Sequence, residues 1–223
     1  MSAPHPTVTT GLFLLLLQED GRPEALGQYT GYGLAGAMLA DLAAAGRVDV
    51  ADEGHLIQVT DPTPTGDPLL DEGLTRFLGH DGKRVSIALT TIGRTLEHAV
   101  GDYLAERGVV EVEEGGWLGL KPRRYPEADG SMEAELREGL IEVLRGAEPT
   151  LQQHAMLGLI SALEIPTAVF DKQDTGLTNR ELKARAAELR ESAGPAVAGV
   201  SRAVRAMHAA VMTGALSANV SDR

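Results

Sequence analysis

The sequence contains no cysteine among its 223 residues. Disulfide bonds and thiolate metal sites are therefore excluded, and the composition fits a reducing compartment. The longest uninterrupted apolar run covers only residues 12–17, whereas a membrane-spanning helix needs roughly 20 apolar residues. Residues 1–17 also lack lysine and arginine, so a secretory signal peptide is not expected. These absences together predict a cytoplasmic protein without a transmembrane segment.

Basic residues are also few. The chain has 20 lysines and arginines against 32 acidic residues, which gives a formal net charge of −12. Residues 1–120 hold seven basic and eighteen acidic side chains, and residues 121–223 hold thirteen and fourteen. Affinity for nucleic acid comes mostly from basic side chains on phosphates, so the charge disfavours nucleic acid as a partner.

The apolar content of 43% is enough for one hydrophobic core, and it favours a single domain. Residues 33–72 have the clearest local pattern. Leucine and methionine recur at helical spacing from Leu34, and Gly46 is placed to end the helix in a left-handed conformation. Residues 48–59 then read as a β-hairpin. After it, Asp67 and Pro68 are typical of a helix start, followed by carboxylates in the first turn.

A second unit repeats this pattern. We expect a helix over residues 91–107 with a buried stripe and a stop at Gly108; the stripe consists of Leu96, Val100 and Leu104. After Gly46, hydrophobic residues or glycine occur at Val48, Val50, Gly54 and Leu56. Counted from Gly108, the same positions are occupied by Val110, Val112, Gly116 and Leu118. The repeat predicts a second unit of similar shape, in which a helix is followed by glycine and a β-hairpin with Trp117 near its tip.

The rest of the chain is predicted to be helical. Ser131 is expected to cap one helix, and capping boxes are expected at Thr150 with Gln153 and at Thr178 with Glu181. The last helix should bury one face, formed by Val197, Val200, Val204, Met207 and Val211. The predicted fold is mainly α, a helical bundle-like single domain with two short β-hairpins, of which the second projects. We expect a flexible terminus over 1–10, the domain over 11–216 and a tail over 217–223.

Patterns typical of catalytic or metal sites are weak. The glycines of 31–36 match a dinucleotide-binding motif formally, but no strand precedes them directly, so a flexible loop is the favoured interpretation. The six histidines lack metal-ligand spacing; they are His5, His55, His80, His98, His154 and His208. Four carboxylates could bind a hard cation, but helix capping and the helix dipole account for them better; they are Asp61, Asp67, Asp71 and Glu72. No enzyme activity, metal or cofactor is expected.

The second hairpin offers a candidate membrane contact. Apolar and aromatic side chains lie beside a basic cluster in the order Trp117, Leu118, Leu120, Lys121, Arg123 and Arg124. At a bilayer surface the ring would lie at headgroup depth and the cations would meet anionic lipid. In the alternative arrangement Trp117 packs inward and the arginines pair with Glu113 and Glu114.

The strings GLAGAMLADLAAAGR (33–47) and PTPTGDPLLDE (62–72) resemble the Golgi phosphoprotein 3 family. The resemblance implies a mostly helical bundle with a projecting β-hairpin that takes part in membrane contact and self-association. It also implies binding of phosphatidylinositol 4-phosphate and recruitment of partner proteins.

The resemblance further implies a headgroup pocket, which eukaryotic members build from one tryptophan and three arginines. These positions fall on Leu26, Ala35, Arg94 and Glu97, so only Arg94 keeps the family residue. We therefore expect binding that follows total anionic charge, carried by Lys121, Arg123 and Arg124 rather than by Arg94.

Two functions remain open at this point. The first is a peripheral membrane-associated adaptor that binds a phosphoinositide or general anionic lipid, recruits unidentified partner proteins and forms a homo-oligomer. The alternative is a winged-helix-like DNA-binding regulator, because a helix followed by glycine and a hairpin also describes a wing. The charge favours the adaptor.

Overall fold

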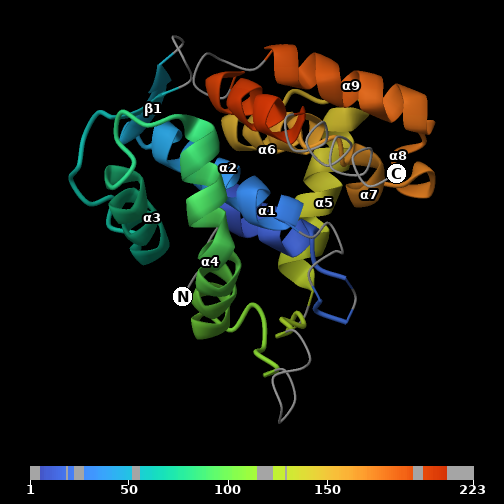
Figure 1. The fold of residues 1–223 in the computed structure, drawn as a ribbon. Helices are drawn as coiled ribbons and strands as arrows, with labels where there is room; N and C mark the ends of the chain where they lie inside the picture. The colour runs from blue at the N-terminus through green and yellow to red at the C-terminus, as the bar shows by residue number, and fades with distance from the viewer. Residues whose placement is uncertain are drawn as a thin grey trace, which may run out of the picture.

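The computed structural model describes residues 6–18, 20–22, 28–51, 56–114, 123–128, 130–192 and 198–209. Helices make up most of this part of the chain (Figure 1), which confirms the predicted mainly α fold. None of the described helices is long and apolar enough to cross a membrane. The elements in chain order are α1 Val8–Leu15, α2 Gln28–Ala44, β1 Val48–Ala51, β2 Leu56–Val59, α3 Pro68–Leu78, α4 Val85–Glu106, α5 Ser131–Leu144, α6 Leu151–Ala162, α7 Pro166–Val169, α8 Lys172–Thr175 and α9 Asn179–Ser192. Residues 198–209 form one more helix.

Helix α1 begins within the stretch that the sequence assigned to a flexible terminus. Thr7 and Thr10 form a capping box at its start. The α2 carboxylate Asp41 accepts hydrogen bonds from the backbone N–H groups of Val8 (2.9 Å) and Thr9 (2.8 Å). Because each of its eight residues is buried, α1 lies inside the fold, as the all-round apolar composition predicts.

Helices α2 and α4 form the most extensive helix pair of the described fold. They cross where Gly31 faces Gly93, and a Cβ on Gly31 would lie 2.5 Å from the Gly93 carbonyl oxygen. Two glycines are needed here because any side chain would push the helices apart. The glycines of 31–36 are therefore part of a helix, and their interpretation as a flexible loop was wrong.

Helices α2 and α4 end in the same way. Gly46 and Gly108 have φ angles of +69° and +70°. After Gly46, the N–H of Arg47 donates to the Leu42 carbonyl at 2.9 Å. After Gly108, the N–H of Val109 donates to the Leu104 carbonyl at 3.0 Å. Both ends are Schellman motifs, which confirms the two predicted helix stops.

The first hairpin also forms as predicted. Strands β1 and β2 are antiparallel, with Val48 opposite Val59 and Val50 opposite Ile57. The N–H of Ile57 donates to Lys83 O (2.8 Å), so the turn before α4 lies along the outer edge of β2. Asp67 then caps α3 through its side chain. The hairpin is thus held between α2, α3 and the start of α4.

The second hairpin is present as a ribbon joined by single bridges. Single antiparallel bridges join Val110 to Glu127 and Glu113 to Arg124. The described partners of the first strand therefore lie at 124–127. Residues 115–122, which include Trp117, fall outside the described part of the chain. In Figure 1 the described part of this ribbon extends from the lower end of α4.

The later helices agree with the prediction in most places. The capping boxes of Thr150 with Gln153 and of Thr178 with Glu181 are present. Ser131 is not a cap, because Gly130 occupies the N-cap position with a φ of +67°. In the helix over 198–209 the buried apolar face includes Val200, Val204 and Met207, whereas Val197 and Val211 lie outside the described residues.

Candidate membrane-contact site

The base of the second ribbon is anchored by Tyr125. Its side chain is fully buried, and its ring packs edge-on against Phe13 of α1 with centroids 5.4 Å apart. Its hydroxyl lies 2.9 Å from Nδ1 of His98 on α4. Gly101 makes room for the ring, since a Cβ there would lie 2.3 Å from it. The ribbon is therefore fixed to α1 and α4 at its base.

The two arginines of the ribbon base are paired with carboxylates. Arg123 donates to Asp102 (2.9 Å) and to Glu114 (2.6 Å), and the hydrogen bond to Glu114 raises the pKa of Arg123 further above its usual value. Arg124 lies 3.7 Å from Asp20. Much of the positive charge expected to meet lipid is therefore balanced within the protein. This part of the structure agrees with the alternative in which the arginines pair with nearby carboxylates.

The apolar residues of the predicted membrane contact lie outside the described part of the chain. These residues, together with the adjacent lysine, are Trp117, Leu118, Leu120 and Lys121. Their contact with a membrane, and the exposure of Trp117, remain predictions.

The family's headgroup positions occupy different environments. Ala35 is completely buried in α2, so its side chain is not available to a ligand. Arg94 is exposed on α4, and Glu97 is half-buried one turn later. Burial raises the pKa of the Glu97 carboxyl. Leu26 lies outside the described residues. The structure thus brings Arg94 and Glu97 to one face and leaves Ala35 in the core.

Helix packing places Arg94 at the edge of the α2–α4 contact. Its neighbour Gly93 touches Gly31 in the first turns of α2, so Arg94 lies on the adjoining, solvent-facing side of α4. The Arg94 guanidinium forms no hydrogen bond or ion pair within the described structure. It is therefore available to a soluble or membrane-bound anion.

The start of α4 adds two residues that the sequence did not suggest. Arg84, at the N-cap, is exposed and makes no side-chain capping bond. Ile87, two turns before Arg94, has 52% of its surface exposed. Because 3.6 residues make one turn, Ile87 and Arg94 face the same direction. The sequence predicted this helix to begin only at Thr91, and so these residues were not assigned to its surface.

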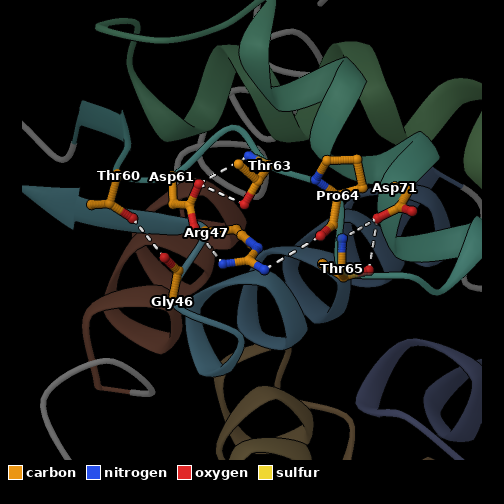
Figure 2. A network of polar contacts seen from close by, with 8 residues as sticks. All are labelled: Gly46, Arg47, Thr60, Asp61, Thr63, Pro64, Thr65 and Asp71. Carbon is orange, nitrogen blue, oxygen red and sulfur yellow. Dashed lines mark hydrogen bonds and ion pairs between the residues drawn. The ribbon is translucent and has the colours of Figure 1, made fainter.

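The loop before α3 is a structural network (Figure 2). Arg47 binds Asp61 at 2.5 Å, and Asp61 also accepts hydrogen bonds from the backbone and hydroxyl of Thr63. Asp71 accepts from the backbone and hydroxyl of Thr65 in the same way. These hydrogen bonds lower the pKa of both carboxyls. The network fixes the loop that joins the hairpin to α3.

The remaining carboxylates of this region also have structural partners. Asp67 accepts from the backbone N–H groups of Leu69 and Leu70, and Glu72 pairs with Arg76 at 2.5 Å. No group of three potential metal ligands occurs among the residues that the structure describes. Asp67 therefore caps α3 as predicted, whereas Asp61, Asp71 and Glu72 are held by side-chain and loop contacts.

The four described histidines each have a hydrogen-bond partner. The partners are Arg76 O for His80, Tyr125 for His98, Ser192 for His154 and Tyr32 for His208. His5 and His55 lie outside the described residues. These contacts agree with the prediction that the described histidines have structural roles and are not metal ligands.

Comparison with known proteins gives two findings. The family model of Golgi phosphoprotein 3 (GPP34) matches residues 10–207. The chain is also similar to the vacuolar protein sorting-associated protein 74 of Eremothecium gossypii, with 25% identity over 165 residues. That match covers 63% of this chain and 50% of the relative, so it spans about half of the relative's length.

Proposed function

The chain belongs to the Golgi phosphoprotein 3 family, and on this premise we propose that it is a peripheral membrane adaptor. It binds anionic lipid through the exposed face of α4 and recruits partner proteins to that surface. Phosphatidylinositol 4-phosphate is the ligand that the family resemblance implies. The proposed location is the cytoplasmic face of a membrane.

The observation that carries this proposal is that the Arg94 side chain is exposed and has no ion-pair partner among the described residues. Arg94 also keeps the family residue at a headgroup position. An arginine presents a planar fork of donors that matches the oxygens of a phosphate. Arg84 adds a second exposed cation at the start of the same helix.

The second ribbon supplies a further contact in this proposal. Its base is fixed by Tyr125, which packs against Phe13 and lies within hydrogen-bond distance of His98. In the sequence between Glu114 and Arg123, Trp117, Leu118 and Leu120 suit insertion at headgroup depth. The proposed binding thus combines a cationic contact from α4 with an apolar contact from the ribbon.

The test is co-flotation of the protein with vesicles of neutral lipid or of neutral lipid with graded anionic content. Binding should rise with anionic content and fall as salt is added, because a few exposed cations at a charged surface contribute about 1 kcal/mol each and are screened by salt. Duplex DNA in a mobility-shift assay at low salt serves as the comparison. Failure to float at any anionic content, or tight binding to DNA, would reject the proposal.

A further inference from the structure

The second ribbon has one covered edge and one open edge. Its first strand, residues 109–114, pairs with the return strand through the N–H of Glu111, which donates to Pro126 O at 2.8 Å. On the other side of the return strand, the N–H of Tyr125 donates to Gly21 O at 2.7 Å. Within the described structure the return strand is therefore bonded on both sides, whereas the first strand is bonded on one side only.

Val110 and Val112 direct their backbone groups to the open edge. In an antiparallel pair, successive residues bond alternately toward and away from the partner strand, and Glu111 and Glu113 are the ones that bond to it. The N–H and C=O groups of Val110 and Val112 form no hydrogen bond within the described structure. An open strand edge of this kind is a template to which another extended chain adds as a further strand.

Free carboxylates accompany this edge. Glu111 and Glu113 are exposed and have no ion-pair partner among the described residues, and the same holds for Glu106 at the end of α4. The Glu111 and Glu113 side chains project from the face opposite to Val110, whose side chain is buried. A chain added at the open edge would therefore meet negative charge along its solvent-facing side.

This charge decides which kind of chain fits the edge. A second copy of the same strand would place carboxylates opposite carboxylates, and like charges directly opposite each other destabilise strand pairing. A basic chain would instead place a cation beside each glutamate. Because residues on one face of a strand are two positions apart, lysine or arginine at alternate positions would match Glu111 and Glu113.

We propose that the open edge of residues 110–114 binds an extended basic segment of a partner protein as an added β-strand. The backbone of Val112 supplies hydrogen bonds to the added strand. Glu111 and Glu113 select lysine or arginine at alternate positions of the segment. This inference rests on the proposed recruitment of partner proteins, and it does not depend on how the protein binds lipid.

The experiment measures binding of a fluorescein-labelled synthetic peptide of about nine residues, in which lysine alternates with threonine, by fluorescence anisotropy. The wild-type protein should bind it about tenfold or more tightly than a peptide in which glutamate alternates with threonine. N-methylation of one alternate set of peptide N–H groups should abolish binding, and N-methylation of the other set should leave it, because only one set faces the protein edge.

Two variants separate backbone pairing from charge. Val112→Pro removes an N–H that has no partner in the described structure, and proline is tolerated on edge strands. It should weaken binding of the lysine peptide about tenfold. Glu111→Lys combined with Glu113→Lys should weaken binding to a similar extent. The matched control is Glu135→Lys combined with Glu142→Lys, which makes the same charge change at exposed positions of α5 and should change binding less than about threefold.

Circular dichroism melting of each variant checks its folding. Peptide binding that survives Val112→Pro and both N-methylations would show attraction by charge without strand addition, and it would overturn the inference. A lower oligomeric state of Val112→Pro in sedimentation would show that the edge joins two copies of this chain, which also overturns it. Lack of peptide binding by a protein that still floats with anionic vesicles overturns this inference alone, whereas loss of both overturns the proposed function as well.

Discussion

At the scale of single residues, Tyr103 connects parts of the chain that are far apart in sequence. Its hydroxyl donates to Asp67 Oδ2 at 2.5 Å, while Asp67 Oδ1 accepts from the first N–H groups of α3. The Arg107 guanidinium lies 3.5 Å from the centre of the Tyr103 ring. Burial, aided by Asp67, raises the pKa of Tyr103 to about 12. One tyrosine thus ties the end of α4 to the start of α3.

Replacing Tyr103 with phenylalanine should lower the free energy of unfolding by about 1 to 2 kcal/mol at neutral pH, because a hydrogen bond to a carboxylate is lost. The folded-state pKa of Tyr103 is higher than the ordinary value of 10. The contribution of its hydroxyl is therefore complete below pH 10 and is lost as pH rises through about 12. Urea unfolding of both proteins at neutral and at high pH measures this difference. Equal stabilities at neutral pH would contradict the assignment.

Residue-scale predictions from the sequence succeeded where the partner is close along the chain. The capping residues Thr150, Thr178 and Asp67 bind groups two or three positions away. The prediction of a cap at Ser131 was wrong, because the glycine before it occupies the N-cap position. The bond from Tyr103 to Asp67 spans 36 positions, and only the packing of α3 beside α4 brings the two residues together.

At the scale of elements, helices α2 and α4 stop at residues with a left-handed backbone conformation. Gly46 and Gly108 leave open space where a Cβ would be, with no atom within 4 Å. Glu164, at the end of α6, adopts a φ of +61° and is the one non-glycine residue with positive φ among those that the structure describes. The demand for glycine at positions 46 and 108 is therefore conformational and does not come from crowding.

Gly46→Val and Gly108→Val should each lower the free energy of unfolding by about 1 kcal/mol or more, because valine is strained at positive φ. Gly79→Val is the matched control, since Gly79 also follows a helix but has a φ of −66°. Thermal unfolding of the three variants checks the comparison. A loss of stability in the control as large as in the other two would show that the cause is not the left-handed backbone.

Elements were predictable where local signals are complete. A glycine marks the end of α2, alternating apolar and polar residues mark the first hairpin, and a capping aspartate marks the start of α3. The start of α4 was placed too late, because its first turns follow a polar turn that pairs with β2. The return strand of the second ribbon could not be assigned from the sequence, because its register depends on Tyr125 packing between α1 and α4, which no local pattern encodes.

At the scale of the whole molecule, most of the cations that the structure describes after residue 120 have structural partners. Arg137 donates to the carbonyl of Val169, Arg145 to that of Asp174 and Arg185 to that of Val143. These bonds hold α7, α8 and α9 against α5. The net charge of a segment therefore does not show where an anion would bind. In the described structure, the exposed and unpaired cations of the candidate site lie on α4.

The family and the fold class were predictable from the sequence, because two long motifs and the helical periodicity carry them. The site was only partly predictable. Arg94 was identified from the family positions, but the burial of Ala35 and the pairing of Arg123 with Asp102 and Glu114 follow from tertiary packing. The pairing also reverses the expected ranking of the cations, so we now expect Arg94 to contribute more than the ribbon arginines.

The most direct test of whether Arg94 contributes more to lipid binding than the ribbon arginines is a comparison of three proteins. These are the wild type, Arg94→Ala, and the double variant that combines Arg123→Ala with Arg124→Ala. Each protein is titrated with vesicles of fixed phosphatidylglycerol content, and folding is checked by thermal melting. Losing one charge-assisted hydrogen bond costs roughly 1.5 to 3 kcal/mol, so Arg94→Ala should weaken binding about ten- to a hundredfold. The double variant should bind within about threefold of the wild type, because Arg123 and Arg124 already face carboxylates of the protein and are less available to lipid than Arg94. Unchanged binding by Arg94→Ala together with a large loss in the double variant would contradict the account and place the lipid contact on the ribbon.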